Sequence, residues 1–186
     1  MNGRAAAALG WVALVIVAFG AGLPSRPDQG EWIVRLLTGA WEGENPTVIA
    51  HFQMMGLWPL AMAALWRREW WRPGHLPAWP FLAGSFVVGC FALLPYAALR
   101  ARPEPPAASL VAGTAPAWVW AAIAAGFVGF GAWAAIAGDV PAWWVGVHTD
   151  AFLWAMSWDF AAFVVLFAAE ARRLSAQPPR RQRSEQ

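Results

Sequence analysis

Five long apolar stretches recur along the chain, separated by shorter segments that hold most of the polar residues. Each stretch has close to the roughly 20 helical residues that cross the hydrocarbon core of a bilayer. A run of this length in lipid must satisfy every backbone polar group internally, which favours helices. We therefore predict an all-α integral membrane bundle of five transmembrane helices, over residues 5–23, 47–66, 77–99, 117–137 and 149–170.

The segment 30–43, between the first two predicted spans, has a different pattern. Its apolar residues recur at i, i+3 and i+4 spacing, with charged residues on the other faces; the apolar set is Trp32, Ile33, Leu36, Leu37, Ala40 and Trp41. This spacing predicts an amphipathic helix, which lies in the headgroup plane of a membrane or packs against the bundle. Asn45 and Pro46 then predict the start of the second span, as an N-cap followed by a proline at the first helical position.

Composition excludes several classes of protein. Hydrophobic residues make up 59% of the 186 residues and charged residues 13%, against about 45–50% and 25% in ordinary soluble domains. A soluble enzyme and a disordered chain are excluded, and the scattered arginines form no stripe that would bind nucleic acid. The single cysteine, Cys90, excludes an internal disulfide and a Cys-based zinc site. We predict one domain over residues 1–174, in contact with the lipid bilayer, and a disordered basic tail over 175–186.

Arginine placement predicts orientation, because cytoplasmic loops carry an excess of Lys and Arg. Five spans place the two termini on opposite sides of the membrane. Arg4, Arg67, Arg68 and Arg72 then lie on the N-terminal side, and the remaining arginines on the C-terminal side. The count predicts a cytoplasmic C-terminus, although the cluster from Arg67 to Arg72 runs against it.

Candidate functional residues are polar groups inside the predicted spans, because an ionisable group at membrane depth must be paired, protonated or in contact with water. Asp159 is the foremost of them. Its own helix offers no polar partner at i±3 or i±4, so a partner must come from another span, and Ser85 lies at a similar depth. The simplest role for Asp159 is a structural hydrogen bond between helices. The alternative is that its carboxylate binds a ligand or transfers a proton.

His51 lies in the first turns of the second span, and a neutral imidazole is a common axial ligand of a haem or chlorophyll-type metal. A lone histidine without a spaced partner is more simply a packed side chain, with Tyr96 expected as its neighbour. Gln53 lies on nearly the opposite face of the same helix. Trp58 lies inside the span beside Pro59, where a kink could open a pocket against a neighbouring helix.

No catalytic motif is present in the sequence: GxSxG, HExxH, DDxxD and P-loop patterns are all absent, and so is the spacing of metal ligands. We therefore assign no catalytic residue and no metal ligand. An internal repeat of the transporter kind is not visible either.

Several stretches carry a resemblance to known proteins. They are Pro27-Asp28-Gln29, Glu44-Asn45-Pro46 with Phe52, Met55-Gly56, Trp58-Pro59, residues 77–81 (PAWPF), residues 91–96 (FALLPY) with Leu99-Arg100, and Met156-Ser157-Trp158-Asp159-Phe160. In this order they resemble an uncharacterised family of small multispan membrane proteins of cyanobacteria and plastids. The resemblance implies an association with photosynthetic membranes and no particular activity. We therefore expect the protein in a plasma membrane or a thylakoid membrane.

Some of the candidate residues match the family pattern and others differ from it. Asp159, Asn45, Trp58 and Tyr96 match it, and Ser157 stands beside Asp159 in the last similar stretch. Two further candidates depart from it: an apolar residue replaces His51 in the family, and Asn replaces Gln53. A pigment-ligand role for His51 is therefore not implied by the resemblance.

These features favour a non-enzymatic accessory or binding protein of a photosynthetic or energy-transducing membrane. Its expected partner is a larger membrane-protein complex, or a lipophilic molecule such as a carotenoid, a chlorophyll, a quinone or a lipid, held in an apolar pocket. One alternative is a small membrane enzyme acting on an isoprenoid or lipid with Asp159 as acid or base, which requires a lateral cleft that reaches this residue. The other is a small transporter with a water path past Asp159.

Overall fold

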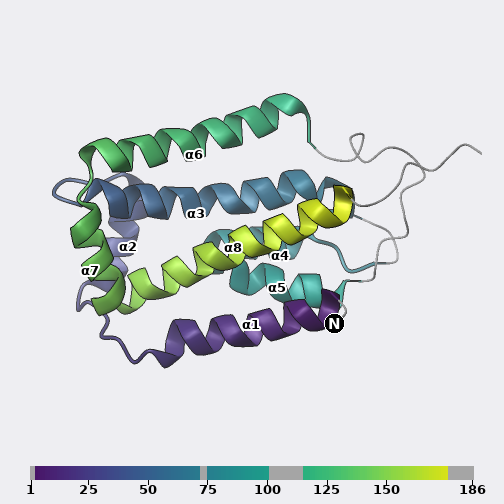
Figure 1. Ribbon diagram of the computed structural model, residues 1–186, viewed down its shortest axis with the longest axis horizontal. Helices are drawn as coiled ribbons and strands as arrows, with labels where there is room; N and C mark the ends of the chain where they lie inside the picture. Colours follow the sequence, from purple (N-terminus) through teal and green to yellow (C-terminus); the bar gives the residue numbers. More distant parts are fainter. Residues whose placement is uncertain (1–2, 72–74, 101–114, 176–186) are drawn as a thin grey trace, which may run out of the picture.

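The computed structural model describes residues 3–71, 75–100 and 115–175. These residues form eight α-helices and one short 3-10 helix, so the predicted all-α class is confirmed (Figure 1). Residues 176–186 of the predicted basic tail lie outside the described ranges. The elements are α1 (Gly3–Gly20), α2 (Gln29–Thr38), α3 (Pro46–Leu65), η1 (Arg67–Glu69), α4 (Trp79–Val88), α5 (Cys90–Leu99), α6 (Ala117–Ala137), α7 (Val140–Thr149) and α8 (Ala151–Ser175).

Four of these helices, α1, α3, α6 and α8, are long and apolar enough to cross a membrane. They run side by side, and successive long helices point in opposite directions (Figure 1). The described chain therefore begins and ends at the same end of the bundle. We call this the arginine end, after Arg4, Arg100 and Arg173. The opposite end, where Asp139 follows α6, is called the Asp139 end.

The prediction that residues 77–99 form one membrane-crossing helix is wrong. This segment forms two ten-residue helices, α4 and α5, that fold back on each other. The residues before α4 and after α5 both contact Glu69. The Ala78 N–H donates to the Glu69 carbonyl at 3.1 Å, and Arg100 pairs with the Glu69 carboxylate at 2.8 Å. The rings of Phe81 and Tyr96, fifteen positions apart in the sequence, have centroids 5.2 Å apart. The segment is thus a helical hairpin that enters the bundle from the arginine end and returns to it.

This hairpin corrects the predicted topology, because the chain makes four full crossings of the bundle and not five. The expectation that the two termini lie on opposite sides is therefore wrong. The turn occurs at Gly89, with φ +64° and ψ −144°. A positive φ is open to glycine at no steric cost, whereas an L side chain at this position would be strained.

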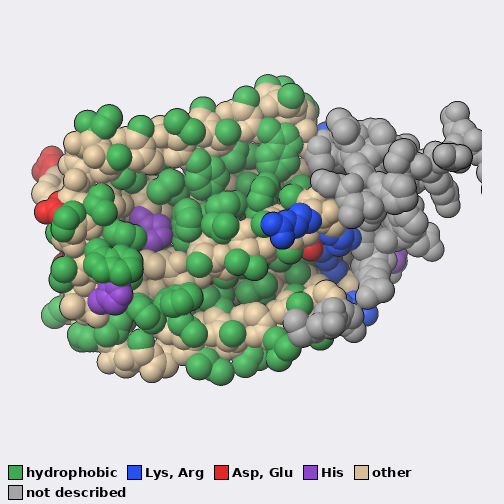
Figure 2. Space-filling model, in the orientation of Figure 1, with side chains coloured by type: hydrophobic (Ala, Val, Ile, Leu, Met, Phe, Trp, Pro, Cys, Tyr) green, Lys and Arg blue, Asp and Glu red, His purple; other side chains and the backbone are tan. Residues whose placement is uncertain are grey.

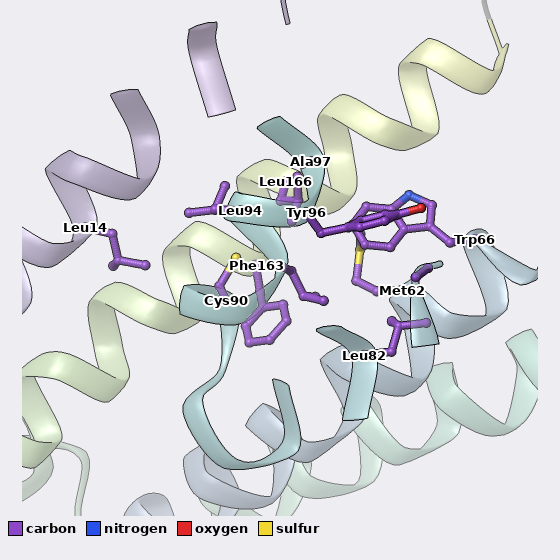
Figure 3. Close-up of a cluster of buried hydrophobic side chains, with 12 residues drawn as sticks. Leu14, Met62, Trp66, Leu82, Cys90, Leu94, Tyr96, Ala97, Phe163 and Leu166 are labelled. Carbon is purple, nitrogen blue, oxygen red and sulfur yellow. The ribbon is translucent and has the colours of Figure 1, made fainter. Parts of the chain in front are cut away.

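The hairpin forms the centre of the main hydrophobic core. Cys90, Leu93 and Tyr96 of α5 are at most 1% exposed. They pack with residues from α1, α3, α4 and α8, among them Leu14, Met62, Leu82, Phe163 and Leu166. The Trp66 and Tyr96 rings lie against each other beside Met62, with centroids 5.1 Å apart (Figure 3). An element that the sequence pattern presents as one more lipid-facing span is therefore surrounded by protein on several sides.

Two short helices cover the Asp139 end. The predicted amphipathic helix is α2, which packs against the bundle: Trp32 and Leu36 are 0% exposed and contact Ile49, Leu153 and their neighbours. The other helix, α7, lies almost entirely between the fourth and fifth predicted spans. Asp139 caps its first turn by accepting a hydrogen bond from the Ala142 backbone N–H at 2.8 Å.

The lateral surface of the bundle is apolar. Figure 2 shows hydrophobic side chains along the full length of the visible face, with arginines gathered at one end and acidic side chains visible at both ends. Val87 and Ile136 are each 86% exposed, and Val165 68%. In water such a surface would drive aggregation, so its natural surroundings are lipid chains or another apolar surface.

Candidate functional site

A groove of about 820 Å³ runs along the outside of the bundle between α1, α5 and α8. Its wall on α1 is built from small residues, including Ala6, Gly10 and Ala13, which keep α1 from filling the space. Its wall on α8 includes Trp158 and Val165. Ligand pockets in proteins have volumes of about 300–1,000 Å³ and are lined mainly by apolar side chains, so the groove has the size and lining of one.

Charged side chains close this groove at the arginine end. Arg4, Arg100, Glu170 and Arg173 all line it, although the rest of its lining is apolar. Arg100 lies between two carboxylates: one guanidinium nitrogen pairs with Glu69 at 2.8 Å and the other pairs with Glu170. Arg173 pairs with the same two carboxylates, at 2.8 Å from Glu170 and 3.5 Å from Glu69. The result is a network of two arginines and two glutamates from three elements of the chain.

The network is largely shielded from solvent. The side chains of Arg100 and Glu170 are 9% and 10% exposed. Burial lowers the pKa of Arg100, but the adjacent carboxylates of Glu170 and Glu69 outweigh this effect and hold it above its ordinary value. Arg100 therefore stays charged at every accessible pH. Tyr96, one of the candidates from the sequence, joins the network by donating its hydroxyl hydrogen to Glu69 at 2.8 Å.

Arg4 is held beside this network in a different way. Its guanidinium donates two hydrogen bonds to the backbone carbonyl of Arg100, at 2.7 and 3.1 Å. Among the described residues, no carboxylate lies within ion-pair distance of Arg4. The mouth of the groove thus carries one positive charge that the network does not balance.

Asp159 lies away from the groove, at the turn of the hairpin. It is 4% exposed, and its Oδ1 atom accepts a hydrogen bond from the Cys90 backbone N–H at 2.8 Å. The partner does come from the predicted third span, but it is a backbone group and not Ser85, whose hydroxyl bonds to the Leu82 carbonyl of its own helix. The carboxylate meets the free N–H groups at the start of α5, which a helix always leaves without an intrahelical acceptor.

His51 is a packed side chain between aromatic rings. It is 7% exposed, its Nδ1 atom accepts a hydrogen bond from the Trp143 indole at 3.2 Å, and its ring meets that of Phe160 edge-on. A neutral imidazole that accepts at Nδ1 carries its proton on Nε2, so this hydrogen bond and metal ligation through Nε2 exclude each other. Tyr96, expected as a neighbour of His51, lies at the arginine end of the bundle because the hairpin returns there.

The other polar candidates make local structural contacts. The Asn45 side chain caps α3, accepting from Thr47, and also joins Asp139 through the backbone N–H and carbonyl of that residue, at 3.0 and 2.7 Å. Gln53 donates to the Leu36 carbonyl of α2 at 3.1 Å. The Ser157 hydroxyl bonds to the Leu153 carbonyl, one turn earlier in α8. These side chains connect elements or satisfy backbone groups, and none of them lines the groove.

Trp58 is the centre of an aromatic cluster between α3, α6 and α8. Its ring lies 4.8–6.2 Å, between centroids, from those of Phe127, Phe160, Phe163 and Phe167. Through Phe160 this cluster also touches His51. Trp58 and His51 therefore both contact the Phe160 ring, and Asp159 is the residue before Phe160 in α8. The seven candidate residues do not form a single site.

The sequence analysis missed the charged network and the groove. Two signals for the network are present in the sequence. Glu170 and Arg173 lie three residues apart at the end of the last span, and Arg100 follows directly after the third apolar stretch. The groove has no such signal, because its walls come from helices whose pairing only the hairpin determines. In the part of the chain that the structure describes, no group of three or more His, Cys, Asp or Glu side chains could hold a metal ion.

Comparisons of the chain with protein-family models, with curated proteins and with solved structures found no match.

Proposed function

We propose that this protein is an integral membrane binding protein that holds a lipophilic molecule in the groove between α1, α5 and α8. The groove itself is the observation that supports the proposal most strongly. It joins a long apolar surface to a polar mouth, which is the arrangement that an amphiphilic ligand in a bilayer requires. Four helices of membrane-spanning length and an apolar lateral surface support the setting.

The distribution of arginines supports an orientation with the arginine end in the cytoplasm. Among the described residues this end holds Arg4, Arg67, Arg68, Arg100, Arg172 and Arg173, whereas the Asp139 end holds Arg26 and Arg35. The cluster at Arg67 and Arg68, which runs against the orientation expected for five spans, agrees with the arginine bias once the chain makes four crossings. Both termini are then cytoplasmic.

The resemblance to membrane proteins of cyanobacteria and plastids supports a place in a photosynthetic or energy-transducing membrane. Under that proposal the ligand is a pigment, a quinone or a lipid, and a larger complex is an additional partner. No structural observation favours the alternatives of an enzyme or a transporter that use Asp159. This carboxylate is buried against Cys90 and does not line the groove, whereas an acid or base must reach its substrate.

A blocked groove tests the proposal. Gly10 lines the groove, and a Cβ added there meets no atom within 4 Å, so Gly10→Leu should fill the groove without straining the helix. Gly129→Leu is the matched control, because this glycine of α6 also faces open space and lies outside the groove. Each full-length protein would be purified from native membranes in mild detergent, and its visible spectrum and extracted lipids would be measured.

We expect a copurifying pigment, quinone or lipid with the wild-type protein and with Gly129→Leu, and its loss from Gly10→Leu. Equal amounts of bound molecules in all three samples would overturn the proposed function. A protein that carries nothing in any sample, but folds normally by circular dichroism, would overturn it as well.

A further inference from the structure

The groove has a charged mouth and an apolar body, and this asymmetry restricts the ligand class. At the mouth, Arg100 and Arg173 are balanced by Glu69 and Glu170 through ion pairs at 3.5 Å or less. The Arg4 guanidinium has five N–H donors, and the structure assigns two donor nitrogens to one backbone carbonyl. Among the residues that the structure describes, no acceptor takes the remaining donors and no carboxylate balances the positive charge of Arg4 at the mouth.

The dimensions of the groove match one leaflet of a bilayer. Its lining on α1 extends from Arg4 to Val17, and on α8 from Arg173 back to Trp158. Thirteen helical residues at 1.5 Å each give a length of about 20 Å, somewhat more than half of a roughly 30 Å hydrocarbon core. A molecule with its polar group at Arg4 would therefore place an extended chain along α1 to just beyond the centre of the membrane.

On this basis, and resting on the proposed function, we propose that the groove binds an acidic membrane lipid. Its anionic headgroup contacts Arg4 at the arginine end, and one acyl chain lies along the small-residue wall formed by Ala6, Gly10 and Ala13. Guanidinium groups form strong hydrogen bonds with phosphate and carboxylate oxygens. Basic pockets between membrane helices on the cytoplasmic side bind such headgroups, because acidic lipids are concentrated in that leaflet.

Charge favours this occupant over a neutral one. A carotenoid or an uncharged quinone would bring no anionic acceptor to the Arg4 guanidinium, which is exposed at the mouth, whereas an anionic headgroup supplies one. A second copy of the chain would have to present a carboxylate at the mouth and a narrow apolar ridge along the rest. The carboxylates on the described surface of the arginine end, Glu69 and Glu170, are already paired with arginines.

The test compares two lipids with the same acyl chains and different headgroups, one anionic and one zwitterionic. Full-length protein in detergent would be incubated with equal amounts of phosphatidylglycerol and phosphatidylcholine that carry the same acyl chains, and bound lipid would be counted by native mass spectrometry. We expect a preference of about five-fold for phosphatidylglycerol, the equilibrium ratio for about 1 kcal/mol from one arginine near the membrane surface. Arg4→Gln should reduce the preference to near unity, and Arg4→Lys should retain most of it.

Arg172→Gln is the matched control, because this arginine is exposed at the same end of α8 but does not line the groove; its preference should equal that of the wild type. Equal binding of the two lipids by the wild type, with Gly10→Leu lowering both, would overturn the acidic headgroup and leave the proposed function standing. Lipid counts that Gly10→Leu does not change would overturn both. A preference lost equally in Arg4→Gln and Arg172→Gln would also overturn the specific contact, since bulk charge would explain it.

Discussion

The Asp159 carboxylate, near the middle of α8, accepts a hydrogen bond of 2.8 Å from the backbone N–H of Cys90, the first residue of α5. A helix that begins inside an apolar bundle exposes N–H groups to surroundings without water, and each unsatisfied group costs several kcal/mol. Asp159 supplies the missing acceptor, and the N-terminal partial charge of α5 stabilises the carboxylate in return. The pair explains how the turn of the hairpin is held at membrane depth.

The first prediction concerns this pair. Asp159→Ala leaves the Cys90 N–H buried without an acceptor, and the free energy of unfolding should fall by about 1–3 kcal/mol or more. Asp159→Asn keeps an acceptor oxygen and should cost less. The measurement is unfolding in mixed detergent and SDS micelles, followed by circular dichroism. Ser157→Ala is the control: its hydroxyl bonds only within α8, so its effect should be within the error. Equal losses for Ala at both positions would show that Asp159 does not hold the turn.

The second prediction concerns the glycine beside the carboxylate. A Cβ on Gly89 would overlap the Asp159 carboxylate, and the positive φ strains any L side chain. Gly89→Ala should therefore lower the free energy of unfolding by about 2 kcal/mol or more, since strain and the lost contact add. Gly131→Ala on α6 meets open space and should be neutral or slightly stabilising, as expected for a helix interior. The same SDS titration gives both values, and a neutral Gly89→Ala would contradict the hairpin turn.

The third prediction concerns the charged network. Arg100→Met leaves Glu69 and Glu170 with Arg173 alone, and removal of one partner from a buried ion pair costs about 3–5 kcal/mol. Adding Glu170→Gln should recover part of this loss, because it removes the unpaired carboxylate. Arg35→Met is the control, since its side chain is 40% exposed and its ion pairs are 3.4 Å long; about 1 kcal/mol or less is expected. Thermal unfolding of the four proteins in one detergent would show whether Arg100→Met and Arg35→Met differ as stated.

The fourth prediction concerns the topology. Single cysteines at His75 and Leu99, which flank the hairpin, should react with a membrane-impermeant maleimide from the same side as a cysteine at Arg172. A cysteine at Thr38 should react from the other side. The native Cys90 is 0% exposed and should stay unlabelled. Labelling of His75→Cys and Leu99→Cys from opposite sides of sealed vesicles would restore a single crossing over residues 77–99 and overturn the hairpin.

Much of this architecture follows from local sequence patterns. The helices α1, α3, α6 and α8 were predicted to within a few residues, because each is a single apolar run of sufficient length. The cap at Asn45 was predicted as well, since an Asn-Pro pair before an apolar run is a local signal. Asp159 was expected to have its partner outside its own helix, and it does, although the partner is the Cys90 backbone and not Ser85. Hydrophobic length and capping chemistry act within a few residues, so they can be read along the chain.

The third apolar stretch shows where this reading ends. Residues 77–99 contain the same alanine, leucine and phenylalanine as the true spans, and hydropathy does not distinguish a helix that crosses from two helices that turn back. The turn depends on Gly89, which is one glycine of 17 in the chain, and on a carboxylate seventy positions later that satisfies the freed N–H groups. His51 and Tyr96 were placed together for the same reason: a straight span would have carried Tyr96 towards His51.

The sequence by itself determined that the chain is all-α, apolar enough to need lipid around it, and capped and interrupted at definite residues, because these properties depend on side-chain chemistry within one or two helical turns. The tertiary structure decided the number of crossings, the shared side of the two termini, the charged network and the groove. Each of these depends on contacts between residues far apart in the chain, such as Cys90 with Asp159 and Arg4 with Arg100, and the free energy of such contacts exists only once the helices have packed.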